Sequence, residues 1–164
     1  MQKICTVSGL LIGLSAWVLL SCGNDKDQAA SAQGFNFNLK DLDGQTRTLA
    51  DYNKKLVLID FWTTWCIPCR ITIPTMNQIY SKYQEDIALV GISLDTADDS
   101  VVRDFAKNMG IAYPVLVGGI TLAREHGISS IPTLFFVNTK GKILKTHTGV
   151  LDATSLEAII NNLI

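Results

Sequence analysis

Two long apolar runs dominate the hydrophobic pattern of the chain. Residues 56–62 read LVLIDFW, with Asp60 as the one polar member, and residues 87–94 read IALVGISL. Apolar runs without alternation are typical of central strands that are covered on both faces of a sheet. By contrast, FNFNL at residues 35–39 alternates apolar and polar positions, and the Asp-Gly pair at 43–44 is a turn signal. The pattern therefore predicts two central strands preceded by a short hairpin.

Apolar residues recur every three or four positions in three segments, which predict helices. The first follows Cys66, the second covers residues 98–110, and the third is the C-terminal segment, which Asp152 is predicted to cap. A short helix is expected near TLAREHG, and strands are expected at residues 133–137 and 142–150. Strands that alternate with helices indicate an α/β fold, with a central mixed β-sheet flanked by helices.

The N-terminal part of the chain differs in character from the rest. Lys3 precedes an apolar stretch that ends in LLSC at residues 19–22, a pattern typical of a secretory signal. This ending resembles the bacterial lipobox, in which the signal is removed before a cysteine that carries lipid, here Cys22. Residues 1–21 are therefore expected to be a lipoprotein signal peptide, and residues 22–34, which are small and polar, a flexible tether. An uncleaved N-terminal anchor is the alternative.

Charge and cysteine usage narrow the chemistry of residues 35–164, the expected folded domain. The whole chain has 14 basic and 15 acidic side chains and a net charge of -1. This balance does not indicate a nucleic-acid-binding protein, which would need a basic stripe. Of the four cysteines, Cys5 lies in the expected signal and Cys22 is assigned to lipid. Only Cys66 and Cys69 remain for the domain, in the sequence WCIPC.

Three chemistries can be considered for this pair: a metal site, a structural disulfide and a redox couple. A structural zinc site needs four ligands, and the domain adds only His126 and His147, so no metal is expected. A structural disulfide would close a very short loop and would therefore stabilise little. A redox couple fits better, because a helix N-terminus favours the thiolate of Cys66. Cys69, three residues later, lies on the same helical face and can reach it.

The sequence LIDFWTTWCIPC, together with SSIPTLFFV further along the chain, resembles the thioredoxin superfamily. The lipoprotein signal, the N-terminal hairpin and an inserted strand and helix are similar to its membrane-tethered, extracytoplasmic branch, the TlpA/ResA-like thiol-disulfide oxidoreductases. The resemblance covers residues 35–164. It implies a thioredoxin-like fold with an N-terminal hairpin and a central strand–helix insertion.

The resemblance implies roles for five residues around the cysteine pair. Cys66 would be the exposed nucleophile, and Cys69 the buried thiol that resolves the mixed disulfide. Pro132 would be a cis-proline that faces the pair. Ile131 would then form the backbone edge on which an extended substrate docks. Trp65 would be the aromatic residue beside the nucleophile, with a core aromatic as the alternative.

Two acidic residues also receive roles from the resemblance. Asp60 interrupts a buried run, and an unpaired buried carboxylate tends to take up a proton. In thioredoxin-like proteins an acid at this place accepts the proton of the resolving cysteine through water; a solvent-accessible aspartate is the alternative. Asp95 would be an acidic modulator near the pair, or else a loop or cap residue. Thr72 departs from the family pattern, because many relatives carry an acid there.

These features predict a lipid-anchored thiol-disulfide oxidoreductase of the bacterial cell envelope, facing the periplasm or the exterior. It is expected to need no cofactor, because the electrons are carried by the cysteines themselves. Its expected partners are cysteine-containing exported proteins, with apocytochrome c as a family-based candidate, and a membrane electron donor. Ile67 and Pro68 bring no charge to the thiolate, so a reductase is predicted rather than a disulfide-forming oxidant.

Two other functions stay open at the level of sequence. A thiol peroxidase is suggested by Thr63, three residues before Cys66, although Ile59 stands where peroxiredoxins have a proline. A copper-handling thioredoxin-like protein would need a distal histidine ligand, which His126 or His147 would have to supply.

Overall fold

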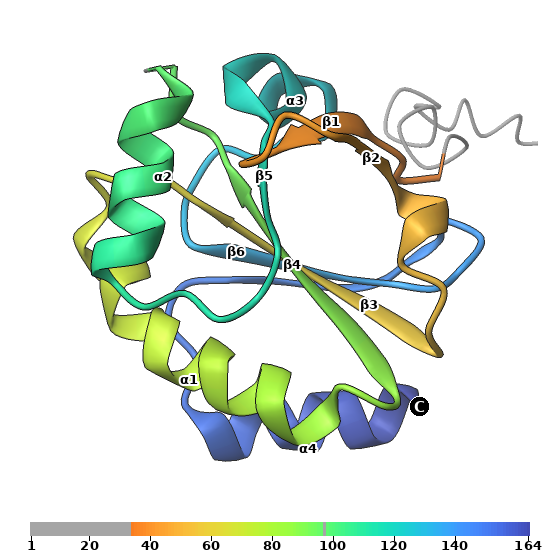
Figure 1. Cartoon of the computed structure of the whole chain (residues 1–164). Helices are drawn as coiled ribbons and strands as arrows, with labels where there is room; N and C mark the ends of the chain where they lie inside the picture. Colours follow the sequence, from red (N-terminus) through yellow and green to blue (C-terminus); the bar gives the residue numbers. More distant parts are fainter. Residues whose placement is uncertain (1–33, 97) are drawn as a thin grey trace, which may run out of the picture. The chain divides into compact units, whose positions relative to one another are not determined.

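The computed structural model describes residues 34–96 and 98–164; Cys22, the expected signal and nearly all of the expected tether lie outside this part of the chain. The described residues form a seven-stranded mixed sheet in the order β2-β1-β5-β4-β3-β6-β7 (Figure 1). Its strands are β1 (Asn38–Asp41), β2 (Thr46–Thr48), β3 (Leu56–Trp62), β4 (Ile87–Ser93), β5 (Val115–Val117), β6 (Thr133–Val137) and β7 (Ile143–Thr148). The helices are η2 (a 3-10 turn, Leu49–Asp51), α1 (Ile67–Tyr83), α2 (Asp99–Asn108), α3 (Gly119–Glu125) and α4 (Ala153–Leu163).

The two predicted central strands are confirmed as β3 and β4. They pair in parallel, and β3 also pairs antiparallel with β6. Every residue of β3 is buried, Asp60 included, as expected for a strand with helices on both faces. Among the described helices, none is long and apolar enough to span a membrane.

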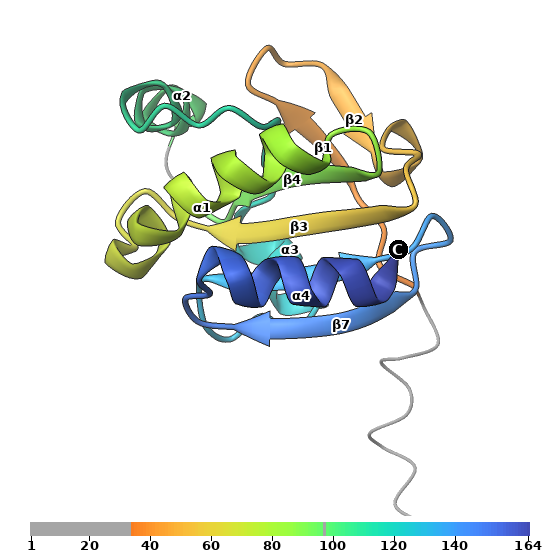
Figure 2. The same ribbon diagram turned by 90° about the horizontal axis from the view of Figure 1, so that it is seen from below.

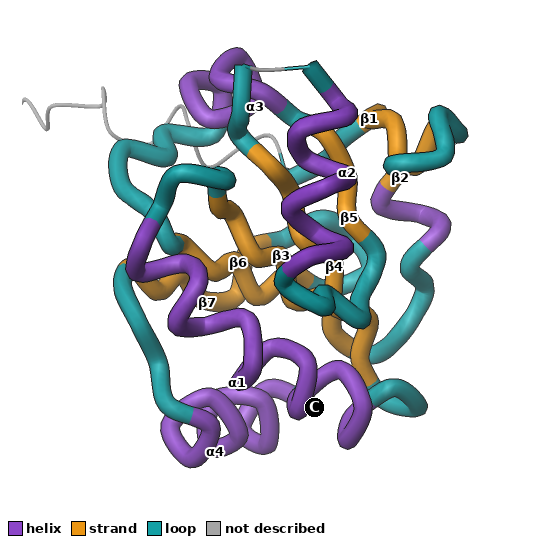
Figure 3. Tube along the Cα trace, turned by 60° about the vertical axis from the view of Figure 1, so that its left-hand side comes forward, coloured by secondary structure: helices purple, strands orange, loops and turns teal. Residues whose placement is uncertain are grey.

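Alternation along β3 divides the interior into two layers. Val57, Ile59 and Phe61 face a core that includes α3 and the segment before β1. Leu56 and Leu58 face the opposite core, which α1 and α4 cover. Figure 2 shows α4 beside the long strand β3, and Figure 3 shows α1 and α4 side by side. The arrangement is the mixed α/β sheet expected from the sequence.

The N-terminal hairpin is present, but it is shorter than the alternating pattern predicted. Phe35 and Phe37 are buried as expected, whereas the strand ladder begins only at Asn38. The Phe35 N–H instead donates to the Gly141 carbonyl across 2.7 Å, so this segment is held by side-chain burial and a contact outside the hairpin. Burial of Phe35 and Phe37 alone accounts for the alternating pattern of FNFNL, without strand pairing before Asn38.

Helix ends follow the predicted signals. Asp152 caps α4 by accepting a hydrogen bond from the Ser155 N–H across 2.9 Å. Asp98 caps α2 in the same way, through the Ser100 N–H. Beyond the end of α2, Gly110 adopts a φ of 62°, in the left-handed region that favours glycine after a helix.

Candidate active site

The two cysteines of WCIPC lie at the start of α1 and form a disulfide. Cys66 is the N-cap of the helix, and Cys69 lies in its first turn. The Cys69 N–H donates to the Cys66 sulfur across 3.2 Å, and Pro68 occupies a first-turn position whose N–H would have no helical partner. The positive end of the helix dipole therefore acts on the Cys66 sulfur, which favours a thiolate there once the bond is reduced.

The expectation that Cys66 is the exposed member of the pair is wrong for the disulfide state. Its exposed fraction is 4%, against 2% for Cys69. The reason is local packing, because both cysteines belong to an apolar cluster with Trp62 of β3 and Val102 of α2. In the disulfide state, little of either cysteine is therefore accessible to an incoming thiol.

Several residues close to the two cysteines along the chain have large apolar side chains that are exposed. Trp65 and Ile67 are each 70% exposed, and Ile71, one helical turn after Ile67, is 64% exposed. The alternative of a core tryptophan at Trp65 is therefore wrong. The peptide bond between Ile131 and Pro132 is cis, as the resemblance implied, and Ile131 packs against the cluster that holds the cysteines. The cysteines thus lie beside an apolar face, a feature typical of contact with other molecules.

Asp60 is fully buried and lies on the α1 side of the sheet. It falls between Leu58 and Trp62 on the same face of β3, so it faces the layer that contains the first turns of α1. Tyr113 donates a hydrogen bond to Oδ2 across 3.2 Å, and Oδ1 has no partner within residues 34–96 and 98–164. Burial raises the pKa of Asp60 to about 7, and the bond from Tyr113 opposes this rise only in part. The solvent-accessible alternative is excluded.

Tyr113 is a residue that the sequence analysis missed. It lies just before β5, is 4% exposed, and its ring passes over Gly91 of β4, which pairs with Asp60. A Cβ atom at Gly91 would lie 2.8 Å from Cε2 of Tyr113 and 2.9 Å from Nε1 of Trp62. The signal in the sequence was the glycine inside IALVGISL, since a glycine within a strand often marks a close approach.

Asp95 holds the loop that leads to the cysteines. Its carboxylate accepts hydrogen bonds from the Thr64 N–H at 2.9 Å, the Thr64 hydroxyl at 2.8 Å and the Ser93 hydroxyl at 2.7 Å. Thr64 is two residues before Cys66, so Asp95 fixes the end of β4 to the start of the active-site turn. This geometry agrees with the loop-residue alternative. Thr72, the departure from the family pattern, is buried and donates to the Cys69 carbonyl.

The two histidines that were considered as metal ligands are both half-buried. The ring of His126 packs on Phe35 with 4.5 Å between centroids, and this burial lowers the pKa of His126. His147 is on β7, and its Nε2 is buried. In the part of the chain that the structure describes, no group of three or more histidine, cysteine or acidic side chains could hold a metal ion.

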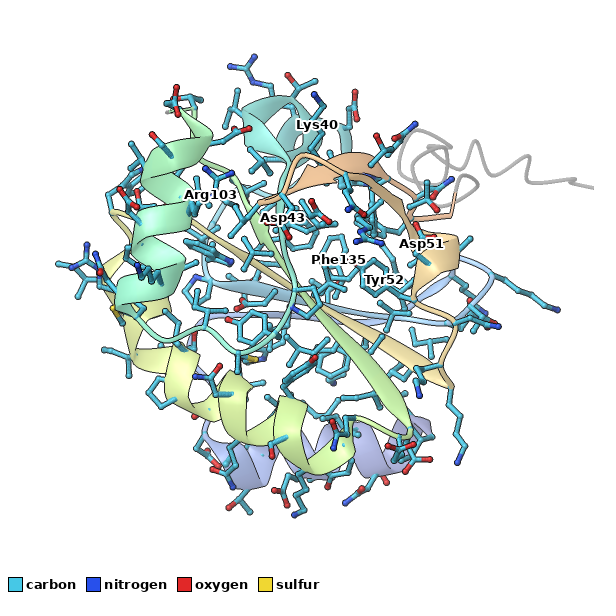
Figure 4. The ribbon with its side chains drawn as sticks, viewed as in Figure 1. Lys40, Asp43, Asp51, Tyr52, Arg103 and Phe135 are labelled. Carbon is cyan, nitrogen blue, oxygen red and sulfur yellow. A yellow bond between two sulfur atoms is a disulfide. The ribbon has the colours of Figure 1, made fainter. Side chains whose placement is uncertain are left out.

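A groove of about 690 Å³ lies between the N-terminal hairpin and α2. Four of the residues that line it are labelled in Figure 4: Asp43 and Arg103 lie toward α2, and Asp51 and Tyr52 lie toward η2. The charged residues that line the groove are of both signs, and some pair locally: Arg103 donates to the Leu42 carbonyl, and Asp41 forms an ion pair with Arg47. The groove therefore does not indicate a ligand of either charge.

Comparison with known proteins agrees with this site. Residues 30–146 match the model of the AhpC/TSA family. The chain is 31% identical to the thiol-disulfide oxidoreductase ResA of Halalkalibacterium halodurans, over 78% of this chain and 73% of that protein. It is 30% identical to the sporulation thiol-disulfide oxidoreductase A of Bacillus subtilis, over 95% of each chain.

A solved structure gives the same result for the fold. The pneumococcal exposed lipoprotein thioredoxin Etrx1 from Streptococcus pneumoniae superposes with a TM-score of 0.70 at 27% identity, over 79% of this chain and 100% of that one. The fold is therefore thioredoxin-like, with the N-terminal hairpin and the inserted segment β4–α2–β5. The cysteine pair lies at the start of α1, and the relatives that match most of the chain are thiol-disulfide oxidoreductases. The chain therefore belongs to the AhpC/TSA family and is an extracytoplasmic thiol-disulfide oxidoreductase of the ResA type.

Proposed function

We propose that the protein reduces disulfides in exported proteins and uses Cys66 and Cys69 as its electron carrier. The observation that carries this proposal is the Cys66–Cys69 disulfide at the N-terminus of α1, beside exposed apolar side chains. The proposal requires no metal and no organic cofactor, because two electrons are stored when the disulfide is reduced to two thiols.

The reaction has two thiol-disulfide exchange steps. The Cys66 thiolate attacks one sulfur of the substrate disulfide, and the other sulfur leaves as a thiolate, which gives a mixed disulfide. Cys69 then loses its proton to Asp60, and its thiolate attacks the Cys66 sulfur. The second substrate sulfur leaves, the Cys66–Cys69 bond forms, and two electrons have passed to the substrate. A proton acceptor with a pKa near 7 is well matched to this second step at neutral pH.

Substrate recognition is assigned to the apolar face and to the cis-proline edge. Trp65, Ile67 and Ile71 provide exposed apolar area, and Ile131 and Pro132 provide a backbone edge for an extended segment. Thr72, which stands where many relatives carry an acid, is buried and adds no charge to this face. We therefore expect cysteine-containing substrates with apolar residues beside their disulfide. Apocytochrome c is a candidate from the family, and the protein's own reduction is assigned to a membrane electron donor.

The experiment that tests this function is the capture of substrates in cells. In Cys69→Ser the second exchange step cannot occur, so disulfide-linked complexes between Cys66 and substrate proteins are expected to accumulate. Non-reducing gels followed by mass spectrometry of the captured proteins measure this accumulation. Cys66→Ser is the matched control, because it keeps Cys69, which is expected not to attack the substrate. Equal capture by both variants, or capture by neither, would contradict the assigned roles.

We propose further that the protein is anchored by lipid on Cys22, after removal of residues 1–21. The support is the LLSC pattern at residues 19–22 and the likeness to Etrx1 of Streptococcus pneumoniae, which is an exposed lipoprotein. A lipid anchor on a tether would keep the domain in the cell envelope, on the periplasmic or exterior side, close to a membrane electron donor.

Lipidation is tested by the mass of the protein in the membrane fraction. We expect a mature chain that begins at Cys22 and carries a diacyl or triacyl group. Cys22→Ser is expected to leave the protein unprocessed or released from the membrane. Cys5→Ser, a cysteine change within the expected signal, should leave anchoring unchanged. A mature protein that begins at another residue and carries no lipid would exclude this proposal.

A further inference from the structure

The buried Asp60 carboxyl has a single hydrogen-bond donor within residues 34–96 and 98–164. Tyr113 donates from its hydroxyl to Oδ2 across 3.2 Å, although the two residues are 53 positions apart in the chain. Asp60 is 1% exposed and Tyr113 is 4% exposed. Neither group can therefore exchange this bond for one to bulk water, and loss of the hydroxyl would leave both carboxyl oxygens unsatisfied.

The space for Tyr113 is provided by a glycine on the neighbouring strand. Gly91 of β4 pairs with Asp60 of β3, and the Tyr113 ring occupies the place where a side chain at Gly91 would extend. The same ring also packs against Tyr80 of α1, with 6.4 Å between centroids. The hydroxyl is thus held at Asp60 by packing from two elements, which is the arrangement expected of a group that orients another.

We propose that Tyr113 is a positioning residue for the resolving step: its hydroxyl orients the Asp60 carboxyl and directs the proton of Cys69 to Oδ1. This inference rests on the proposed role of Asp60. Because Oδ2 is engaged by Tyr113, Oδ1 is the oxygen without a partner among the described residues. The Cys69 S–H bond breaks as Oδ1 takes the proton. The Cys69 thiolate then forms its bond to Cys66, and the substrate sulfur leaves with the electron pair of the broken disulfide.

Few other titratable groups face this carboxyl from the surrounding elements. At the paired positions, β4 presents Gly91 and β6 presents Leu134. The inward face of α1 presents Cys69 and then apolar or hydroxyl side chains (Thr72, Ile73 and Met76). The groups that can titrate here are therefore Tyr113 and the two cysteines after reduction. Burial raises the pKa of Tyr113 well above its ordinary value, so its hydroxyl remains a donor at physiological pH.

Tyr113→Phe removes the hydroxyl and keeps the ring. Without its donor, the Asp60 carboxylate is less stable relative to the neutral acid, so a smaller fraction is ionised at pH 7. We expect the release of a model substrate from the mixed disulfide to slow about 3- to 10-fold at pH 7. At pH 9, where Asp60 is ionised in both proteins, the difference in ionisation disappears and only the part of the loss that is due to orientation should remain. Stopped-flow measurement of the full-chain protein across pH gives both rates.

Two controls separate positioning from a purely structural role. Tyr80→Phe changes the neighbouring tyrosine, which has no bond to Asp60, and is expected to keep the wild-type pH profile. In an Asp60→Asn background, Tyr113→Phe should have no further effect on resolution. A Tyr113→Phe profile with the wild-type midpoint would overturn the proposal.

A measurement on the unaltered, oxidised protein needs neither substrate nor a variant. The ¹³Cζ resonance of Tyr113 should change with pH at the same midpoint as the Asp60 carboxyl resonance, while that of Tyr80 should not. Absence of this shared midpoint would overturn the inference. Because no substrate is present, a shared midpoint together with failed substrate capture would reject the proposed function alone and leave the Tyr113–Asp60 linkage established.

Discussion

The effect of Asp60→Asn on the free energy of unfolding of the oxidised protein is expected to be about 4 kcal/mol more stabilising at pH 8 than at pH 3. Burial raises the pKa of Asp60 from 3.8 to about 7. Each unit of difference between the pKa values in the folded and unfolded states corresponds to about 1.4 kcal/mol of stability. At pH 3 the carboxyl is neutral in both states, so there is no ionisation penalty. Between pH 4 and 7 only the unfolded state ionises, and the wild type loses stability with rising pH. Above pH 7 the loss is complete and constant.

The pH dependence separates this effect from the cost of the new amide. The NH₂ group of a buried asparagine needs acceptors, and its unmet hydrogen bonds would reduce the stability of the variant equally at every pH. Urea unfolding of both proteins at pH 3, 5 and 8, with the disulfide intact, measures the difference. Asp86→Asn, which removes an exposed ion pair with Lys55, is the control and should change stability by less than about 1 kcal/mol. A constant Asp60→Asn effect from pH 3 to 8 would mean that Asp60 ionises normally.

The main strands, the helix caps and the cysteine pair were predictable because they depend on local pattern. The apolar run of β3 and the cap at Asp152 are each contained within a few residues. The cis bond at Pro132 and the placement of the cysteines followed from a resemblance in short motifs. In each case the neighbours along the chain determine the local structure.

The features that were missed depend on contacts between distant segments. The bond from Tyr113 to Asp60 joins residues that no periodicity relates, and it exists because Gly91 opens a space on a third segment. The burial of Cys66 results in the same way from packing with side chains of β3 and α2. Helical spacing indicates that two cysteines can meet, but it does not indicate what covers them.

The direction of electron flow depends on how strongly the protein stabilises the Cys66 thiolate. A couple is more oxidising the more its reduced form is stabilised, so donors near the Cys66 thiolate decide its potential. In the described residues the Cys66 sulfur accepts a hydrogen bond only from the Cys69 N–H, and the residues between the cysteines are Ile67 and Pro68.

The nearest cationic residue in sequence does not add a donor to this sulfur. The Arg70 guanidinium donates to the Thr64 carbonyl across 2.7 Å and lies 5.4 Å from the centre of the Phe105 ring. Thiolate stabilisation is therefore left to the helix N-terminus. We expect a potential near the thioredoxin value of about -270 mV, rather than near the strong-oxidant value of about -120 mV. At about 1.4 kcal/mol per 30 mV, the two differ by about 7 kcal/mol, which is large enough to decide the function.

The reduction potential of the Cys66–Cys69 couple decides whether the protein is a reductase or an oxidant. The protein is equilibrated with dithiothreitol buffers of known ratio, alkylated, and analysed by mass spectrometry of the peptide that contains both cysteines, so that other thiols do not interfere. A potential close to about -270 mV is the result we predict, and it would make the protein a reductase that depends on a membrane donor. A potential above roughly -170 mV would contradict this account and make the protein an oxidant or an isomerase.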